Sequence, residues 1–400
     1  MADPVIDIRI ALEQALSHHR AGRMKEAEQA YRRILAVKPD HVEASHWLGV
    51  LAHQVGQHEA AVQLIAHATL KDPGNALYLN NLGLALQGAG RLGAARVAYE
   101  QAIAIDPNQA DTHNSRGLVL QAQGEIGEAL ASFRQAIALD PQFAEAHNNL
   151  GNALVALGEI TEAVAAYRRA IEIKPDFGGA YSNLLLCLQY DAGTDAAASA
   201  AAHRDWNARF AAKLTDQAPP HDNDGDPDRR LRIGYVSADF CRHPVASFIE
   251  PLLASHDREA FEVFCYSNVA TPDDVTERLR HFADTWRPIR ELDRQQLTDL
   301  IREDGIDILV DLAGHTAGNR LLAFARKPAP VQVTYLGYPA TTGLDAIDYR
   351  LTDDFTDPPG TDPPGTDALY SETLVRLPGG SLCFQPPYAG PSVSPLADLD

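Results

Sequence analysis

Residues 90–123 read GRLGAARVAYEQAIAIDPNQADTHNSRGLVLQAQ, and residues 124–157 read GEIGEALASFRQAIALDPQFAEAHNNLGNALVAL. The two stretches share their glycine, alanine and proline positions, and the pattern continues on both sides at a constant step of 34 residues. The step is held by two columns, Gly22, Gly56, Gly90, Gly124, Gly158 and Pro39, Pro73, Pro107, Pro141, Pro175. Two independent columns in one register indicate a tandem repeat.

A 34-residue period is typical of tetratricopeptide repeats, in which each unit is a helix, a turn and an antiparallel helix. Proline ends the second helix because it lacks the N–H that a helix needs. An alanine column marks where the helices approach closely: Ala27, Ala61, Ala95, Ala129, Ala163. Because single units cannot bury their apolar faces, we expect five units over residues 7–176 to stack as a right-handed superhelix. FGGAYSNLLLCLQY, residues 177–190, is interpreted as a closing helix.

The composition of this 400-residue chain excludes several classes of binding partner. A formal net charge of −20 repels phosphate backbones, and no basic stripe occurs, so we expect no nucleic-acid partner. The four cysteines form no CxxC pair, which indicates neither a zinc site nor a disulfide framework and fits a cytoplasmic protein. No secretory signal pattern begins the chain and no run of about eighteen apolar residues occurs, so we expect no membrane span.

Four regions are expected: repeats over 1–190, a helix and acidic linker over 191–230, an α/β lobe over 231–385, and a linker stub over 386–400. The linker APPHDNDGDPDRR, residues 218–230, contains a DxD pair that could indicate metal, but such a pair would have to end a core strand. We therefore expect no metal site there. From residue 231, strands such as LRIGYVSAD and IDILVDLAG alternate with helical segments, which predicts a parallel sheet.

Three polar segments follow strands of this expected sheet. SADFCRHP (237–244) follows the first strand, AGHTAGNR (313–320) follows IDILVDL, and LGYPATTG (336–343) follows VQVTY. Ligands of open α/β sheets bind outside the carboxyl ends of the strands, so we expect these segments to form one crevice suited to a sugar or a phosphate. Simpler roles stay open: His243 could only pack its loop, Asp239 could cap the next helix, and Asp311 could bond backbone.

Long stretches of residues 231–385, such as RIGYVSADFCRHPVASFIEPLL and KPAPVQVTYLGYPATTGLDAIDYRLTD, carry a resemblance to a known family. They resemble the amino-terminal catalytic lobe of the O-linked N-acetylglucosamine (O-GlcNAc) transferase family. With tetratricopeptide repeats immediately upstream, the architecture also resembles bacterial members of that family.

The resemblance implies an inverting, metal-independent transfer of N-acetylglucosamine from UDP-N-acetylglucosamine to serine or threonine hydroxyls of acceptor proteins, without a cofactor. It implies that the α/β region is the first Rossmann-like lobe of a GT-B-type glycosyltransferase. His243 matches the family's active-site histidine, which acts as a base or an acceptor-orienting group. Further matches lie beside the donor sugar (His315, Thr316) and near its N-acetyl group (Leu336, Gly337, Tyr338, Pro339).

In this family an asparagine ladder along the superhelix grips the acceptor backbone. The matching column is Trp47, Asn81, Ser115, Asn149, Asn183. The resemblance thus implies acceptor contacts at Asn81, Asn149 and Asn183, weaker towards the amino end. A neighbouring column of Asn80, Asn114 and Asn148 could instead serve packing between helices.

Family members continue into a second lobe that holds the UDP pyrophosphate, and we expect this chain to be cut at the linker between lobes, with little transfer activity alone. Two alternatives remain: a non-catalytic repeat scaffold with a vestigial lobe, and a transferase that uses another nucleotide sugar.

Overall fold

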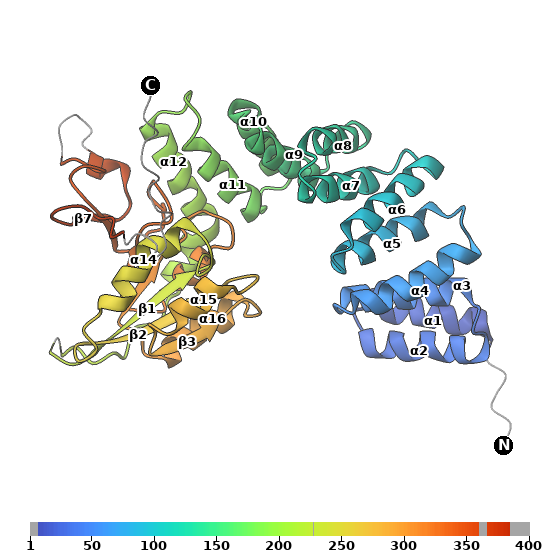
Figure 1. Cartoon of the computed structure of the whole chain (residues 1–400), viewed down its shortest axis with the longest axis horizontal. Coiled ribbons are helices and arrows are strands. Elements are labelled where there is room, and N and C mark those ends of the chain that lie inside the picture. Colours follow the sequence, from blue (N-terminus) through green and yellow to red (C-terminus); the bar gives the residue numbers. More distant parts are fainter. Residues whose placement is uncertain (1–6, 227, 360–365, 385–400) are drawn as a thin grey trace, which may run out of the picture. The chain divides into compact units, whose positions relative to one another are not determined.

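The computed structural model describes residues 7–226, 228–359 and 366–384, and the expected linker stub over 386–400 lies outside them. The chain divides into two compact units, Met1–Pro175 and Asp176–Asp400. The first is helical and the second is built on a parallel sheet (Figure 1). This confirms the predicted fold class, a tetratricopeptide superhelix followed by an α/β lobe.

In the part of the first unit that the structure describes, ten helices form five antiparallel pairs (Figure 1). Their bounds are α1 Ile8–Arg20, α2 Met24–Val37, α3 Val42–Gln54, α4 His58–Lys71, α5 Ala76–Gly88, α6 Leu92–Ile105, α7 Ala110–Ala122, α8 Ile126–Leu139, α9 Ala144–Ala156 and α10 Ile160–Ile173. Each second helix ends two residues before a proline of the repeat column. The glycine column follows the first helix of each pair with a φ between 72° at Gly22 and 83° at Gly124, a left-handed conformation that favours glycine.

Small residues let the paired helices approach closely. The alanine column is fully buried, with 0% exposure at each of its five positions. A Cβ placed on Gly83, Gly117 or Gly151 would lie 2.5 Å from the ring of the aromatic residue 16 positions later, which is Tyr99, Phe133 or Tyr167. Glycine is therefore required at this second column by the bulk of the facing ring.

The expected closing helix forms as α11 (Gly178–Leu188), and the division at Pro175 groups it with the second unit rather than with the repeats. It is followed by α12 (Ala196–Trp206), a π-helical turn (Asn207–Ala211) and α13 (Ala212–Asp216). The Tyr181 hydroxyl donates to Asp205 Oδ2 at 2.5 Å, which joins α11 to α12.

Seven parallel strands form the sheet in the order β3-β2-β1-β4-β5-β6-β7. Their bounds are β1 Leu231–Ser237, β2 Phe261–Ser267, β3 Thr285–Pro288, β4 Ile308–Asp311, β5 Val331–Thr334, β6 Tyr349–Thr352 and β7 Thr373–Arg376. The connecting segments contain α14 Pro244–Ser255, α15 Asp274–Arg280, α16 Arg294–Glu303, α17 Leu321–Phe324 and a 3-10 turn at Thr366–Leu369. Because β2 and β4 lie on opposite sides of β1, the strand order reverses between β1 and β4, where α/β folds bind ligands.

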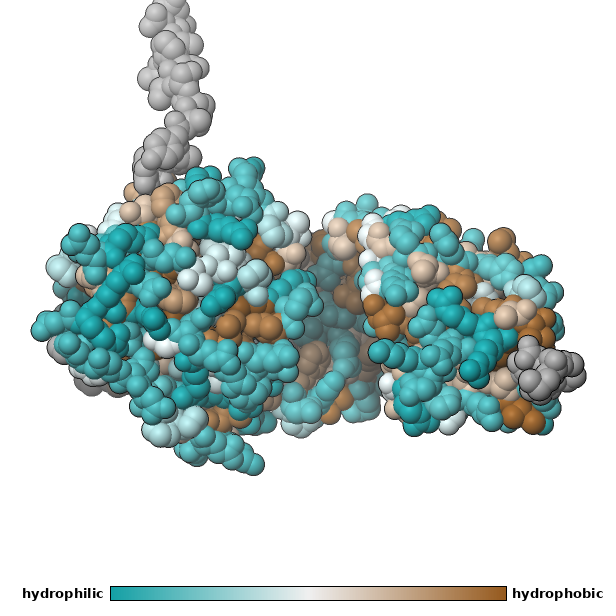
Figure 2. Space-filling view, turned by 90° about the horizontal axis from the view of Figure 1, so that it is seen from below, coloured by the Kyte–Doolittle hydropathy of each residue, from teal (hydrophilic) through white to brown (hydrophobic). Residues whose placement is uncertain are grey.

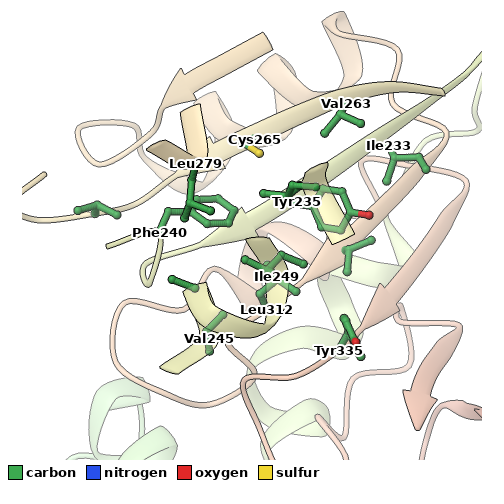
Figure 3. Packing of buried hydrophobic residues seen from close by; sticks show 14 of the residues in the cluster. Ile233, Tyr235, Phe240, Val245, Ile249, Val263, Cys265, Leu279, Leu312 and Tyr335 are labelled. Atoms are coloured by element: carbon green, nitrogen blue, oxygen red, sulfur yellow. The ribbon is translucent and has the colours of Figure 1, made fainter. Parts of the chain in front are cut away.

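A single apolar cluster holds helices α14 and α15 on this sheet (Figure 3). Tyr235 of β1 and Cys265 of β2 contribute from the strands, while Ile249 of α14 and Leu279 of α15 contribute from the helices. Leu312, directly after β4, belongs to the same cluster, so the core anchors the start of a loop at the carboxyl ends of the strands.

Hydrophilic side chains cover most of the face drawn in Figure 2, which agrees with the charged composition. Within the described ranges, none of the helices combines the length and apolar composition that a membrane span needs.

Candidate active site at the carboxyl ends of the strands

His243 stands at the amino end of α14, after the loop that leaves β1. It is extended, with φ −145° and ψ 152°, as expected for a residue before proline. Its Nδ1 accepts the backbone N–H of Val245 at 3.3 Å, so His243 is the N-cap of α14. The neutral ring then carries its proton on Nε2, and 44% of the side chain is exposed. His243 can therefore offer an N–H to a ligand while its other nitrogen holds the helix.

Asp239 lies beside this histidine, with its Oδ2 3.9 Å from His243 Nδ1. Burial raises the pKa of Asp239, and the nearby His243 partly counteracts the rise. The interpretation of Asp239 as the helix cap is wrong, because His243 occupies the N-cap position. Asp239 instead faces the Nδ1 side of the histidine ring from the loop after β1.

A pocket of about 460 Å³ opens beside His243. Phe248 of α14 and Phe384 contribute aromatic walls, with ring centroids 5.8 Å apart. Cys241 and Arg278 also line the pocket, and the Arg278 guanidinium is paired with Glu250 at 2.6 Å. The exposed histidine thus borders a concave and largely apolar surface.

Asp311 ends β4 and shapes the loop that follows it. Its carboxylate accepts the N–H groups of Ala313 at 3.2 Å and Gly314 at 2.8 Å, and the Thr334 hydroxyl at 3.0 Å. Burial raises the pKa of Asp311 to about 6. Asp311 therefore bonds backbone N–H groups, as the simpler interpretation of the sequence predicted.

His315 lies inside the unit rather than on the open face of this loop. Its side chain is 1% exposed and its Nε2 donates to Thr342 O at 2.8 Å. The Trp206 ring packs edge-on at 4.7 Å between centroids, and burial lowers the pKa of His315 to about 3. The neighbouring Thr316 is partly exposed, and its hydroxyl donates to Ala313 O at 2.8 Å.

The segment after β5 makes a tight turn. Leu336 has a φ of 64°, and the Gly337 N–H donates to Tyr335 O at 2.9 Å. Leu336 and Gly337 are partly exposed and Pro339 is exposed, whereas Tyr338 is 2% exposed. The four predicted residues of this loop are therefore split: three reach the surface and one points into the unit.

Asn268, at the carboxyl end of β2, ties these loops together. Its N–H donates to Ser237 O at 2.8 Å and its Nδ2 to Gly318 O at 2.7 Å, while its Oδ1 accepts from Arg320 at 2.8 Å. The ends of β1 and β2 and the loop after β4 are thus brought together, as the sequence predicted for β1 and β4. Asn268 was not predicted, although its place at a strand end was a usable signal.

Two predicted acceptor residues of the first unit contact the preceding repeat. Asn81 Nδ2 lies 2.8 Å from His46 Nε2, and Asn149 Nδ2 donates to Asn114 Oδ1 at 3.0 Å. Asn183 belongs to α11 of the second unit. Among the described residues, no three histidine, cysteine or acidic side chains converge as metal ligands would.

The fold is thus a tetratricopeptide unit followed by a parallel α/β unit whose loops gather at the carboxyl ends of the strands, where such folds bind ligands. Residues 200–380 match the model of glycosyl transferase family 41. Tetratricopeptide models match residues 18–82, 88–124 and 114–176. Over its repeats and part of a catalytic region, the chain is thus similar to proteins of the O-GlcNAc transferase family.

Similar proteins carry names of the same family. The probable UDP-N-acetylglucosamine–peptide N-acetylglucosaminyltransferase SPINDLY of Petunia hybrida is 48% identical over 203 residues, which are 50% of this chain and 21% of that protein. The likewise named SEC of Arabidopsis thaliana is 40% identical over 151 residues, which are 38% of this chain and 15% of that protein. A mutant of the Thermobaculum terrenum O-GlcNAc transferase is 42% identical with a TM-score of 0.72, covering 80% of this chain and 60% of that one. The chain thus spans about a fifth of the length of the SPINDLY relative.

Proposed function

We propose that this chain supplies the acceptor-binding repeats and the first catalytic lobe of a protein O-GlcNAc transferase. The donor is UDP-N-acetylglucosamine, the acceptors are serine or threonine hydroxyls of proteins, and the transfer inverts the anomeric carbon without a metal or cofactor. The family match over residues 200–380 and the names of the similar proteins support this assignment. The four scattered cysteines, which form no CxxC pair, favour a cytoplasmic location.

The observation that carries the proposal is the exposed His243 at the strand-order reversal. Because its Nδ1 accepts the Val245 N–H, the ring presents Nε2–H rather than an unprotonated nitrogen. Of the two roles that the resemblance implies, this tautomer favours orientation of the acceptor by a donated hydrogen bond. A role as base would require the proton to move to Nδ1, towards the Asp239 carboxylate 3.9 Å away.

The donor sugar is proposed to lie against the partly exposed Thr316, Leu336, Gly337 and Pro339. His315 and Tyr338 are enclosed, so we assign them the support of these loops rather than direct contact through their side chains. Acceptor polypeptide is proposed to bind along the column of Asn81, Asn149 and Asn183.

A transfer assay tests this function. The 400-residue chain, alone and joined to the second catalytic lobe of a family 41 relative (the two-lobe form), is incubated with acceptor peptides and labelled UDP-N-acetylglucosamine. We expect labelled serine or threonine in the two-lobe form. A panel of other UDP- and GDP-linked sugars tests the alternative donor. Peptide binding without transfer from any nucleotide sugar would contradict the proposal and support the scaffold alternative.

A further inference from the structure

The turn after β5 is strained. Leu336 is a non-glycine residue in the left-handed region, with a φ of 64°, and the Gly337 N–H returns to Tyr335 O at 2.9 Å. This three-residue hydrogen-bonded ring with positive φ is the rare and strained form of γ-turn. The next backbone is equally constrained, because a Cβ on Gly337 would lie 1.9 Å from Leu312 O. Strain of this kind persists only where the surroundings hold the chain in place.

Tyr338, directly after the turn, connects it to the neighbouring loops and helices. Its ring packs on Gly314, where a Cβ would lie 2.2 Å from Tyr338 Cβ. Its carbonyl accepts Arg350 Nη1 at 3.1 Å, and its hydroxyl lies 2.8 Å from His203 Nε2. The contact with His203 joins the turn to α12, which lies 135 residues earlier in the chain.

The hydrogen bonds of His203 define which atom donates. Its Nδ1 lies 2.7 Å from Ser199 O, and a carbonyl can only accept, so the ring proton is on Nδ1. Nε2 therefore accepts from the Tyr338 hydroxyl. The ring is 0% exposed, and burial lowers the pKa of His203 to about 4, which keeps it neutral near pH 7.

We propose that His203 is a positioning residue of the transferase: by accepting the Tyr338 hydroxyl, it holds the Leu336–Gly337 turn in the shape that receives the donor sugar. The effect on the turn is a property of the lobe itself, whereas the effect on the donor rests on the proposed function. Helix α12 thereby shapes the donor loop without touching substrate.

Three substitutions separate this role from general packing. Tyr338→Phe removes only the hydroxyl. His203→Asn can keep a donor for Ser199 O but offers no acceptor to Tyr338, whereas His203→Gln places an amide oxygen near the position of Nε2. Tyr235→Phe is the matched control, because the Tyr235 hydroxyl contacts His256 Nε2 at the same 2.8 Å elsewhere in the lobe.

The hydrogen-exchange rate of the Gly337 amide in the 400-residue chain measures how often the turn opens. We expect exchange about 2- to 10-fold faster in Tyr338→Phe and His203→Asn, the range that the net energy of one neutral hydrogen bond gives. Exchange in His203→Gln and Tyr235→Phe should stay near the wild-type rate, as should the β5 amides in all variants. Unchanged Gly337 exchange in Tyr338→Phe would overturn the proposal whether or not His203→Asn folds. The Tyr338 hydroxyl also bonds Gln189, which stays in place in the two His203 variants, so their difference assigns the effect to His203.

The two-lobe form tests the consequence for the reaction. Tyr338→Phe and His203→Asn should raise the donor KM about 2- to 10-fold and leave the acceptor KM unchanged, with recovery in His203→Gln. Faster exchange with an unchanged donor KM would remove the catalytic part of the proposal. If wild type transfers no sugar, the proposed function fails, while the exchange experiment still decides whether His203 holds the turn.

Discussion

Asn149 donates its side-chain amide to Asn114 Oδ1, 3.0 Å away in the preceding repeat. Asn81 and His46 make the same contact two repeats earlier, and both pairs are 35 residues apart. The two neighbouring columns therefore bond each other between repeats. Between Asn81 and Asn149, the same column has Ser115, which is 35 residues after Asn80. Asn80 Oδ1 is buried without a hydrogen-bond partner. An asparagine that grips an acceptor must also serve this contact.

Ser115→Asn should supply the missing donor to Asn80 Oδ1 and stabilise the first unit by about 0.5–1.5 kcal/mol. The gain is reduced by the loss of the bond between Ser115 and the Tyr99 hydroxyl. Differential scanning calorimetry of the whole chain measures the change. The reverse substitution, Asn149→Ser, is the matched control: it leaves Asn114 Oδ1 unpaired and should destabilise by about 1–3 kcal/mol. A lower melting temperature for Ser115→Asn would contradict the pairing rule.

His243→Ala should reduce transfer by the two-lobe form by roughly 10² or more, the scale of losing an acid–base or orienting group. It should also cost about 1 kcal/mol of stability, because α14 loses its N-cap. His243→Asn separates the two effects, since asparagine is a good N-cap but has no Nε2–H. We expect it to fold as stably as wild type and to transfer as poorly as His243→Ala. Transfer within about threefold of wild type in His243→Asn would make this histidine structural.

The second unit should lose stability as the pH falls below about 6.5. Burial lowers the pKa of His203 to about 4 and that of His315 to about 3, so both stay neutral in the fold where the unfolded chain takes up protons. Their stabilising contribution is complete above pH 6.5 and is lost towards pH 4, at about 1.4 kcal/mol per pH unit for each histidine. Urea unfolding between pH 7 and 5 measures the slope.

The control for this pH dependence is His203→Gln, which should flatten the slope by about 1.4 kcal/mol per pH unit. Comparison with a variant is needed because burial raises the pKa of Asp311 to about 6. Protonation of Asp311 therefore stabilises the fold as the pH falls from 6 to 4, which opposes the effect of the histidines. In a Trp47→Phe background the remaining tryptophans, Trp206 and Trp286, both report on the second unit. An equal slope in both proteins would show that His203 titrates normally in the fold.

Gly337→Ala should destabilise the second unit by about 1–3 kcal/mol, the usual cost of overpacking. The added Cβ would lie 1.9 Å from Leu312 O, which is backbone and cannot rotate away. Gly93→Ala is the control: no atom lies within 4 Å of a Cβ there, and alanine in helix α6 should stabilise by about 0.5–1 kcal/mol. We expect the unfolding midpoint of Gly337→Ala to lie below that of the wild type and the midpoint of Gly93→Ala to lie above it. A stabilised Gly337→Ala would contradict this expectation.

The repeats and the strands could be predicted from the sequence because their signals are local. A helix that must pack on its neighbour every 34 residues repeats its glycines and prolines, and the structure places helix ends at those columns. Buried parallel strands appear as short apolar runs, and β1, β4 and β5 lie within the segments predicted. The polar segments that follow β1, β4 and β5 are local features as well.

Tertiary structure alone decided which of those polar residues face outward. His243 and His315 look alike in the sequence, each in a glycine- or proline-containing loop after a strand. The first is 44% exposed, and the second is enclosed by α12 and the loop after β5. His203 carries no sequence signal, because its partner Tyr338 lies 135 residues away. Sequence periodicity indicates on which face of its own helix or strand a residue lies. Whether that residue can bind a ligand or only supports a loop depends on which distant segment of the chain packs over it.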